Sequence, residues 1–173
     1  MQSPASYPLN AWYAAAWDVE VTRQPLARTL CDRPIMLYRK QNGDPVALAD
    51  GCWHRLAPLS KGVLSGDNII CPYHGLRFGP SGQCVHMPSS GKIHPSMAVP
   101  AYPALERHRF IWLWMGDPAR ADPALVPDLH WNHDPAWNSD GKVYHMACDY
   151  RLVVDNLMDL THEAFVHQSS IGQ

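Results

Sequence analysis

Long apolar runs, an excess of charge of one sign and an even set of cysteines are all missing from this sequence. Its strongest apolar stretches, residues 11–17 and 110–115, are too short to span a bilayer. The 173 residues carry a formal charge of −2, which provides no electrostatic attraction to nucleic acid or to an anionic membrane. Five scattered cysteines do not make the disulfide framework of a small secreted domain. Because no basic segment followed by an apolar one opens the sequence, we expect a cytoplasmic protein.

Proline and glycine, by contrast, are frequent, with 16 and 11 copies. Between these turn signals lie short stretches rich in β-branched and aromatic residues, which are typical of strands. The pattern predicts an all-β structure over roughly residues 20–116. The expected strands lie at residues 34–38, 45–49, 68–71, 76–78, 83–86 and 107–115.

The pattern changes after residue 116. Residues 117–141 are dense in proline and aspartate, and we expect a connector there. Alternation over 142–150 predicts a strand that enters a second sheet, and residues 149–165 carry acids and a histidine at helical intervals, which predicts a helix from about Leu152. The expected fold class is therefore mainly β. A first domain at 1–116 with an N-terminal extension precedes the connector and the beginning of a second domain at 142–173.

Two mixed pairs of thiol and imidazole are the strongest chemical signal. Cys52 and His54 lie two positions apart in G-C-W-H-R, and after 16 residues Cys71 and His74 lie three apart in C-P-Y-H-G. A tetrahedral zinc ion is one possible occupant, but zinc fingers usually group cysteine with cysteine and histidine with histidine. A [2Fe–2S] centre with two thiolates on one iron and two imidazoles on the other needs two nearly equivalent mixed pairs. We therefore favour the iron–sulfur interpretation over zinc or four unrelated structural residues.

The other three thiols have no histidine at ligand spacing. Cys31, Cys84 and Cys148 are therefore expected to be small buried apolar side chains.

A second constellation follows in residues 155–167, D-N-L-M-D-L-T-H-E-A-F-V-H. Its histidines, His162 and His167, are five residues apart, whereas the zinc-protease motif H-E-x-x-H spaces them by four. On an ideal helix a spacing of five leaves two side chains about 140° apart. To share a metal ion, His167 must lie beyond the end of the helix or past a distortion. The zinc-protease interpretation is therefore rejected.

Together the two motifs resemble those of the Rieske non-heme iron aromatic-ring oxygenases. C-W-H-x16-C-P-Y-H-G is similar to the Rieske signature, and residues 155–167 match (D/E)-x3-D-x2-H-x4-H at each specified position. The resemblance implies a Rieske [2Fe–2S] cluster and a mononuclear Fe(II) site, to which His162 and His167 contribute two ligands. The implied ligands of the cluster are Cys52, His54, Cys71 and His74.

The resemblance also implies how the two sites communicate. Asp159, one helical turn before His162, can accept the free N–H of that ring, and in the family the corresponding Asp links this ring to the cluster histidine of a neighbouring subunit. Carried over, His74 of one chain would reach Asp159 of the next in a homotrimer, with Asp155 in support. The third iron ligand, a carboxylate, comes from far downstream in the family, and Glu163 is expected to point away.

Residues 8–17, 110–118 and 155–167 look most like the oxygenase subunits of vanillate O-demethylases, which run to about twice this length. The resemblance implies a Rieske β domain followed by the truncated beginning of a helix-grip-like α+β catalytic domain. It implies a terminal oxygenase that uses O2 to O-demethylate a methoxylated aromatic acid such as vanillate. The electrons would come from NAD(P)H through a reductase that carries flavin and [2Fe–2S]. The alternative is a stand-alone Rieske electron carrier, in which the helix after residue 152 is structural.

Overall fold

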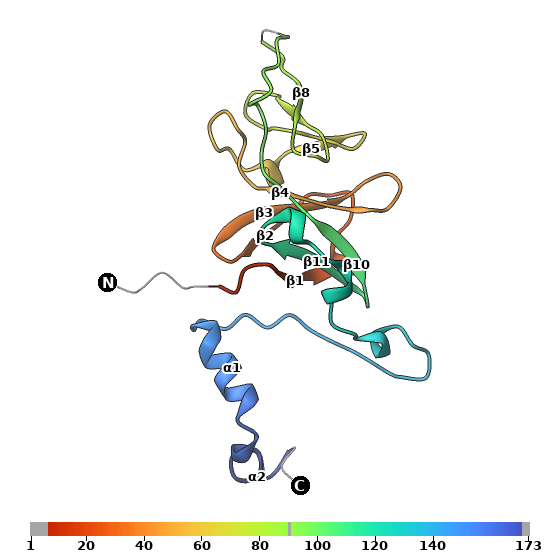
Figure 1. Cartoon of the computed structure of the whole chain (residues 1–173), viewed down its shortest axis with the longest axis vertical. Coiled ribbons are helices and arrows are strands. Elements are labelled where there is room, and N and C mark those ends of the chain that lie inside the picture. The colour runs from red at the N-terminus through yellow and green to blue at the C-terminus, as the bar shows by residue number, and fades with distance from the viewer. Residues whose placement is uncertain (1–6, 90, 171–173) are drawn as a thin grey trace, which may run out of the picture. The chain divides into compact units, whose positions relative to one another are not determined.

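The structure is a computed structural model and describes residues 7–89 and 91–170. The chain divides into two compact units, Met1–Ser139 and Asp140–Gln173. All the strands that the structure describes belong to the first unit, and the helices α1 and α2 belong to the second (Figure 1). None of the helices in these residues has the length and apolar character that crossing a membrane would require.

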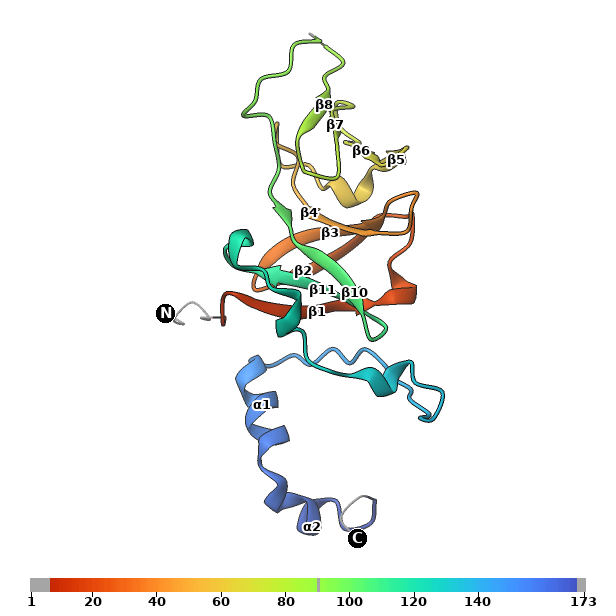
Figure 2. The same cartoon turned by 45° about the vertical axis from the view of Figure 1, so that its right-hand side comes forward.

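The strands of the first unit form three antiparallel sheets, with the orders β1-β11-β10, β2-β3-β4-β9 and β5-β6-β7-β8. Figure 2 shows the sheet β5–β8 at one end of this unit, β1 and β11 at the other, and the sheet that contains β3 and β4 between them. The strands are β1 (Ala11–Trp17), β2 (Leu26–Leu30), β3 (Arg33–Arg39), β4 (Pro45–Ala49), β5 (Val63–Ser65), β6 (Asn68–Ile70), β7 (Arg77–Phe78), β8 (Cys84–His86), β9 (Ala101–Tyr102), β10 (Ala104–Arg107) and β11 (Phe110–Met115).

The central strand β3 is buried on both faces. Ile35 and Leu37 pack toward β1 and β11 in one hydrophobic core, whereas Met36 and Tyr38 pack toward Phe78 in a second core. Successive side chains of a strand point to opposite faces, so the unbroken apolar run I-M-L-Y supplies both cores at once. This double burial fixes the third sheet against the rest of the unit.

The expected mainly-β fold is confirmed, and the strands around the central sheet were predicted closely. The prediction at 45–49 coincides with β4, and that at 34–38 lies within β3. The predictions for β6, β7 and β8 were each one residue too long. Four strands were not predicted, namely β1, β2, β5 and β9, and β1 begins before the expected all-β region.

The strand predicted at 107–115 is confirmed over residues 110–115 but wrong at its beginning, where the chain turns back. Strand β10 ends at Arg107 and β11 begins at Phe110, and the two form an antiparallel hairpin. His108 and Arg109 make the turn with φ angles of 56° and 66°. Two-residue hairpin turns with both φ values positive normally carry Asn or Gly, so this sequence gave no turn signal.

The strand predicted at 142–150 is also wrong. Residues 142–149 form no strand, because alternation alone does not supply the neighbouring strand whose hydrogen bonds a ladder needs. Helix α1 (Tyr150–Met158) begins earlier than predicted, since the carboxylate of Asp149 accepts the N–H of Arg151 at 3.0 Å and caps the first turn.

The single helix expected through residue 165 is interrupted at Asp159. A 3-10 turn (Leu160–His162) follows, and then the short helix α2 (Glu163–Val166). The remaining 3-10 turns lie at Asp18–Glu20, Leu59–Lys61, Pro118–Arg120, Pro123–Leu125 and His130–Asn132, the last three within the predicted connector.

Candidate metal centres

The first of two loop tips follows β4 and is closed by main-chain hydrogen bonds around Cys52. The N–H of Cys52 donates to the carbonyl of Ala57 at 2.9 Å, and the N–H of Leu56 donates to the carbonyl of Cys52 at 2.8 Å. Leu56 has a φ of +54°, in the left-handed region that residues with a Cβ rarely adopt. The tip thus has a fixed shape that its own backbone determines.

The second tip, between β6 and β7, repeats this pattern. The N–H of Cys71 donates to the carbonyl of Leu76 at 2.8 Å, and the N–H of Gly75 donates to the carbonyl of Cys71 at 3.1 Å. Gly75, like Leu56, lies four residues after its cysteine and has a positive φ, here +75°. The two tips are therefore equivalent in backbone hydrogen bonding, although the histidine follows the cysteine by two residues in one and by three in the other.

The four predicted cluster ligands come together in two layers. The thiols of Cys52 and Cys71 are 2% exposed and interact with each other. The rings of His54 and His74 are exposed, and their Nδ1 atoms are 3.2 Å apart. The pairing is thus thiol with thiol on the buried side and imidazole with imidazole on the exposed side.

This arrangement fits a two-iron centre better than a single tetrahedral ion. Two nitrogens that each bind one ion at about 2.0–2.1 Å with tetrahedral angles lie roughly 3.3 Å apart, close to the separation of the two Nδ1 atoms. Within residues 7–89 and 91–170, no set of three or more His, Cys, Asp or Glu side chains is placed to hold one metal ion. A Rieske [2Fe–2S] centre has this ligand set, with two thiolates on one iron and two imidazoles on the other.

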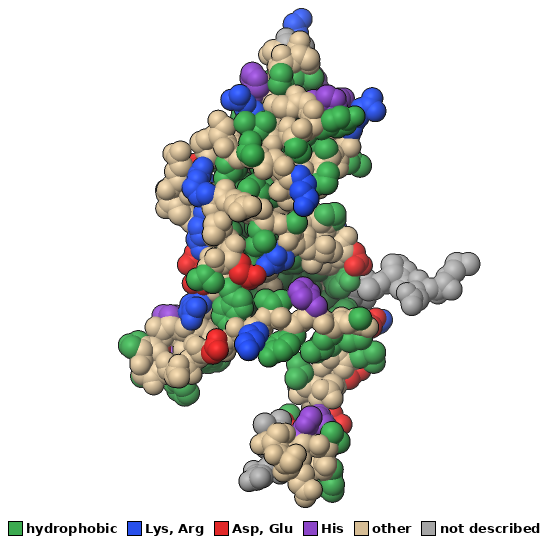
Figure 3. Space-filling model, turned by 180° about the vertical axis from the view of Figure 1, so that it is seen from behind, with side chains coloured by type: hydrophobic (Ala, Val, Ile, Leu, Met, Phe, Trp, Pro, Cys, Tyr) green, Lys and Arg blue, Asp and Glu red, His purple; other side chains and the backbone are tan. Residues whose placement is uncertain are grey.

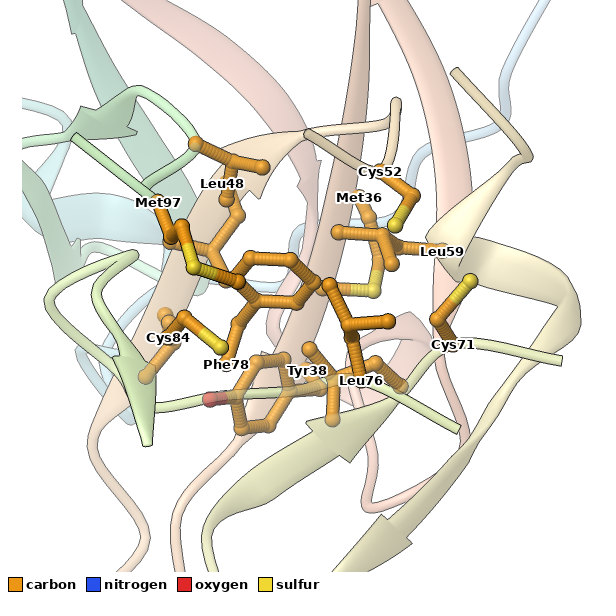
Figure 4. Close-up of a cluster of buried hydrophobic side chains, with 13 residues drawn as sticks. Met36, Tyr38, Leu48, Cys52, Leu59, Cys71, Leu76, Phe78, Cys84 and Met97 are labelled. Atoms are coloured by element: carbon orange, nitrogen blue, oxygen red, sulfur yellow. The ribbon is translucent and has the colours of Figure 1, made fainter. Parts of the chain in front are cut away.

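The thiols lie at the edge of a hydrophobic cluster (Figure 4). Burial raises the pKa of the Cys52 thiol to about 11, and the neighbouring Cys71 thiol adds to the shift. The main-chain N–H groups of His54 and Arg55 act in the opposite direction, because they donate to the Cys52 sulfur. Without metal the thiol therefore keeps its proton at neutral pH, and metal binding releases it, after which these N–H groups stabilise the thiolate.

The three other cysteines do not share one environment. Cys84 is buried, as expected, and lies on the opposite side of the same hydrophobic cluster from Cys52 and Cys71 (Figure 4). Cys31 is only partly buried and Cys148 is exposed, so the expectation of burial is wrong for both. Cys148 lies in the irregular segment where a strand had been predicted, which explains its exposure.

Two features beside the tips were missed in the sequence. The carboxylate of Asp50 accepts the N–H and the hydroxyl of Ser60 at 2.7 and 2.6 Å, which ties together the two ends of the first tip. The ring of Tyr73 lies against that of His74, with centroids 3.9 Å apart and planes tilted by 33°. The position of Tyr73 directly before His74 in C-P-Y-H could have predicted that the two rings lie together. No pattern in the sequence predicts the contact between Asp50 and Ser60.

The second histidine pair lies where the helix is broken. His162 ends the 3-10 turn and His167 follows the last residue of α2, so His167 lies beyond a helix end, as the spacing of five requires. Their ring centroids are 5.4 Å apart. Both histidines line a hollow of about 200 Å³ together with Asn156, Leu157, Leu160 and Glu163. Asn156 was not recognised as a neighbour of this pair in the sequence.

Glu163 was expected to point away from the histidines, but it lines the same hollow. The reason is the change from a 3-10 turn to an α-helix at this residue, which alters the rotation between neighbouring side chains. In the described part of the chain, Glu163 and the two histidines are not placed to hold one metal ion together.

The acids before His162 have local roles in the structure. The carboxylate of Asp159 accepts the N–H of Thr161 at 3.1 Å and the hydroxyl of Thr161, and these bonds lower the pKa of Asp159. The Nδ1 of His162 contacts the main-chain carbonyl of Asp159 and not its carboxylate, which corrects the expected contact. The side chain of Asp155 is exposed, and its carbonyl accepts the N–H of Asp159 at 3.1 Å. The link from Asp159 to His74 of another chain stays a prediction.

Comparison with known proteins gives two family matches. The Rieske [2Fe–2S] domain matches residues 11–103, and the vanillate O-demethylase oxygenase C-terminal domain matches residues 146–173. The dicamba O-demethylase oxygenase component of Stenotrophomonas maltophilia is 48% identical over 162 residues, which are 93% of this chain and 48% of that protein. A vanillate O-demethylase oxygenase subunit of Pseudomonas sp. (strain HR199 / DSM 7063) is 47% identical over 167 residues, which are 96% and 47% of the two chains.

A crystal structure of dicamba monooxygenase bound to dicamba matches with a TM-score of 0.90 at 48% identity and covers 95% of this chain and 49% of that one. The chain thus spans about half the length of the curated relatives it matches. The predicted resemblance is confirmed. The first unit has the fold of an iron–sulfur domain, with the four predicted ligands in two pairs, and the chain belongs to the Rieske [2Fe–2S] domain family.

Proposed function

We propose that this chain is the cluster-bearing part of the terminal oxygenase component of a Rieske non-heme iron monooxygenase. The observation that carries the proposal is the two-plus-two pairing at the tips, with 3.2 Å between the Nδ1 atoms of His54 and His74. The second histidine pair, at a broken helix later in the chain, supports an oxygenase over a simple carrier. The names of the relatives, which are oxygenase components of demethylases and monooxygenases, support the same class.

Each cluster ligand has a task that its environment explains. Cys52 and Cys71 would hold one iron inside the protein, where their burial excludes water from the sulfur atoms. His54 and His74 would hold the other iron at the surface, where their exposed rings can face a partner. When bound, the cluster supplies one-electron transfer at a potential that the two neutral imidazoles raise.

His162 and His167 would hold a mononuclear Fe(II), which when bound supplies the activation of O2. The main-chain carbonyl of Asp159 holds the Nδ1 side of the His162 ring, which leaves Nε2 of that ring for the metal. The carboxylate of Asp159, kept anionic by its bonds to Thr161, is the group that we propose connects to His74 of a neighbouring subunit in a homotrimer. Asp155, one turn earlier on α1, supports that carboxylate.

The proposed substrate is a methoxylated aromatic acid such as vanillate. The aryl methyl ether, O2, two electrons and two protons give a phenol, formaldehyde and water. A reductase that carries flavin and [2Fe–2S] delivers the electrons singly from NAD(P)H. The dicamba and vanillate demethylases among the relatives support this class.

The test uses the product of the complete reading frame. We expect acid-labile sulfide, a reduced-cluster EPR signal, additional mononuclear iron, and O2 uptake with methoxybenzoates that yields formaldehyde in equal amount. A protein with a cluster but no mononuclear iron, and with no dependence on His162, is instead a stand-alone electron carrier. A colourless protein without labile sulfide would refute both proposals.

A further inference from the structure

Three histidines that neither candidate metal centre uses gather where the connector meets the β10–β11 turn. His108 lies in the turn, and His130 and His133 lie in the connector. The rings of His108 and His133 are nearly parallel, with centroids 5.3 Å apart and 17° between their planes. One carboxylate oxygen of Asp128 lies 3.6 Å from Nε2 of His108, and the other lies 3.1 Å from Nδ1 of His130. Figure 3 shows histidine side chains, in purple, where the connector lies, at the lower left of that view.

Two hydrogen bonds to main-chain carbonyls hold the same segments together. The side-chain amide of Asn132 donates to the carbonyl of His108 at 3.2 Å. The guanidinium of Arg107 donates to the carbonyl of Pro123 at 2.8 Å. Neither bond involves a group that titrates near neutral pH. The histidine rings are therefore the part of this contact that can respond to a moderate change in pH.

The ring of His108 is placed to be neutral. Its side chain is 13% exposed, and its Nδ1 atom is buried without a hydrogen-bond partner in the part of the chain that the structure describes. A neutral ring needs one N–H, which Nε2 can direct toward Asp128. Protonation would add a second N–H at the buried Nδ1 atom, where no acceptor is present. An unsatisfied buried donor on a charged group is costly.

The charges around His108 favour the same neutral form. Burial is the largest influence and lowers the pKa of His108 below its ordinary 6.5. Positive charge on Arg107, His130 and His133 acts in the same direction. Asp128 opposes them, but its carboxylate also accepts the N–H of His130 at 3.0 Å. In the described residues these side chains are not placed to hold one metal ion, so a proton is the ligand to consider.

We propose that His108, Asp128, His130 and His133 form an acid-sensitive clasp that fastens the connector to the β10–β11 turn. We call these four residues the connector clasp. Near neutral pH the uncharged ring of His108 stacks on that of His133 and keeps the connector in place. When His108 takes up a proton, one carboxylate must balance a group of cations, and the connector leaves the turn reversibly. The inference is independent of the proposed function, because no residue of the clasp is a candidate metal ligand.

The direction of the pH effect follows from linkage. The pKa of His108 is lower in the closed clasp than in an exposed imidazole, so the open form binds more protons between the two values. The clasp is therefore most stable above pH 6.5 and weakens as the pH falls through the lowered pKa of His108. Asp128 stays ionised in this range, because the N–H of His130 lowers its pKa from 3.8. The connector leads into residues 140–173, so the device loosens the covalent link between the two units in mild acid.

The experiment measures hydrogen exchange of the cluster-loaded chain by mass spectrometry at about pH 7.5 and about pH 5.5, corrected for the intrinsic exchange rate at each pH. We expect protection within residues 122–134 to fall severalfold in acid, while that of β3 and β4 stays constant. His108→Asn should remove this fall, because asparagine cannot titrate and accepts the positive φ of 56° at this position. His145→Asn, which changes an exposed histidine outside the clasp, should keep the fall.

Asp128→Asn is the second variant, and it decides the matter if His108→Asn loosens the connector at both pH values. It keeps an oxygen for the N–H of His130 but removes the charge that favours protonated His108. The fall in protection should then be larger than in the unmodified chain, and an unchanged fall would overturn the inference. So would a fall that persists in full in His108→Asn, no fall in the unmodified chain, or an equal fall in β3 and β4, which would mean global unfolding.

Discussion

The cluster tips and the two-histidine segment differ in what holds their side chains. Cys52 and Cys71 belong to a core of buried residues, and main-chain hydrogen bonds fix both loops. No side chain is buried in residues 140–170, and Phe165 is 85% exposed. Helix α1 has only nine residues, and helices of that length are marginal without packing. The first unit therefore positions its candidate ligands by its own packing, whereas the described part of the second unit has no buried side chain that could do so.

This difference separates two kinds of site. The four predicted cluster ligands lie within 23 residues of sequence, on one loop between β4 and β5 and another between β6 and β7, so local folding brings them together. The pair His162 and His167 shares a hollow, but no third ligand joins it in the described residues. The two thiols and two imidazoles at the tips are therefore brought together by the first unit alone, whereas the described residues bring only two possible ligands together at the second site.

The largest effect is expected when a tip thiol is removed. Cys71→Ala should abolish the visible absorption, the labile sulfide and the EPR signal of the cluster, because one iron loses half of its protein ligands. Cys84→Ala is the matched control, since it removes a buried thiol from the same hydrophobic cluster (Figure 4). It should retain the cluster at a packing cost of about 1–2 kcal/mol in the free energy of unfolding. Equal loss of the cluster in both variants would contradict the ligand assignment.

The second effect tests the histidine pair in the product of the complete reading frame. His162→Ala should remove the mononuclear iron, measured by metal analysis, and leave the cluster EPR signal unchanged, because the two sites lie in different units. His145→Ala removes an exposed histidine from the second unit and serves as the control. Retention of all the iron in His162→Ala would show that this pair is structural.

A smaller effect is expected at Asp159, whose carboxylate caps a turn in the structure and, by our proposal, also links two subunits. Its oxygen caps the turn that carries His162, and an amide oxygen caps nearly as well. Asp159→Asn should therefore keep the fold and the iron but lower turnover by about 10- to 100-fold, in the range found for groups that orient metal ligands. Asp159→Ala should also lose about 1 kcal/mol of helix stability. Normal turnover in Asp159→Asn, measured as formaldehyde release, would exclude the proposed link between subunits.

The sequence predicted the parts of the structure that short-range chemistry determines. The mixed spacing of Cys52, His54, Cys71 and His74 indicated a two-iron centre, and the structure pairs the four side chains as such a centre needs. The apolar run of β3 likewise indicated a strand, because its burial on both faces leaves no polar position to obscure the pattern.

The errors lie where distant contacts decide the outcome. The hairpin turn at His108 and Arg109 takes positive φ values without Gly or Asn, because pairing of β10 with β11 imposes it. Strand β1 reads as an alanine-rich apolar run and becomes a strand only through its pairing with β11, about a hundred residues later. The contact of His162 with a carbonyl in place of a carboxylate depends on the break in the helix, which periodicity did not indicate.

The smallest expected effect compares a buried phenol of the first unit with an exposed one of the second. The hydroxyl of Tyr38 donates to the carbonyl of Asp67 at 2.7 Å, and burial, with the charge of Asp67 adding to it, raises the pKa of Tyr38 from its ordinary 10.0 to about 12. Between these values the folded chain keeps a proton that the unfolded chain releases. The stabilisation is therefore complete below pH 10 and is lost as the pH rises through 12, by at most about 2.7 kcal/mol.

Tyr38→Phe should cost about 1 kcal/mol at neutral pH for the lost hydrogen bond. It should also remove this decline in stability, measured by urea unfolding at a series of alkaline pH values. Tyr144→Phe, which removes an exposed phenol, should leave the decline in place, and equal curves for the two variants would show that Tyr38 is not its source.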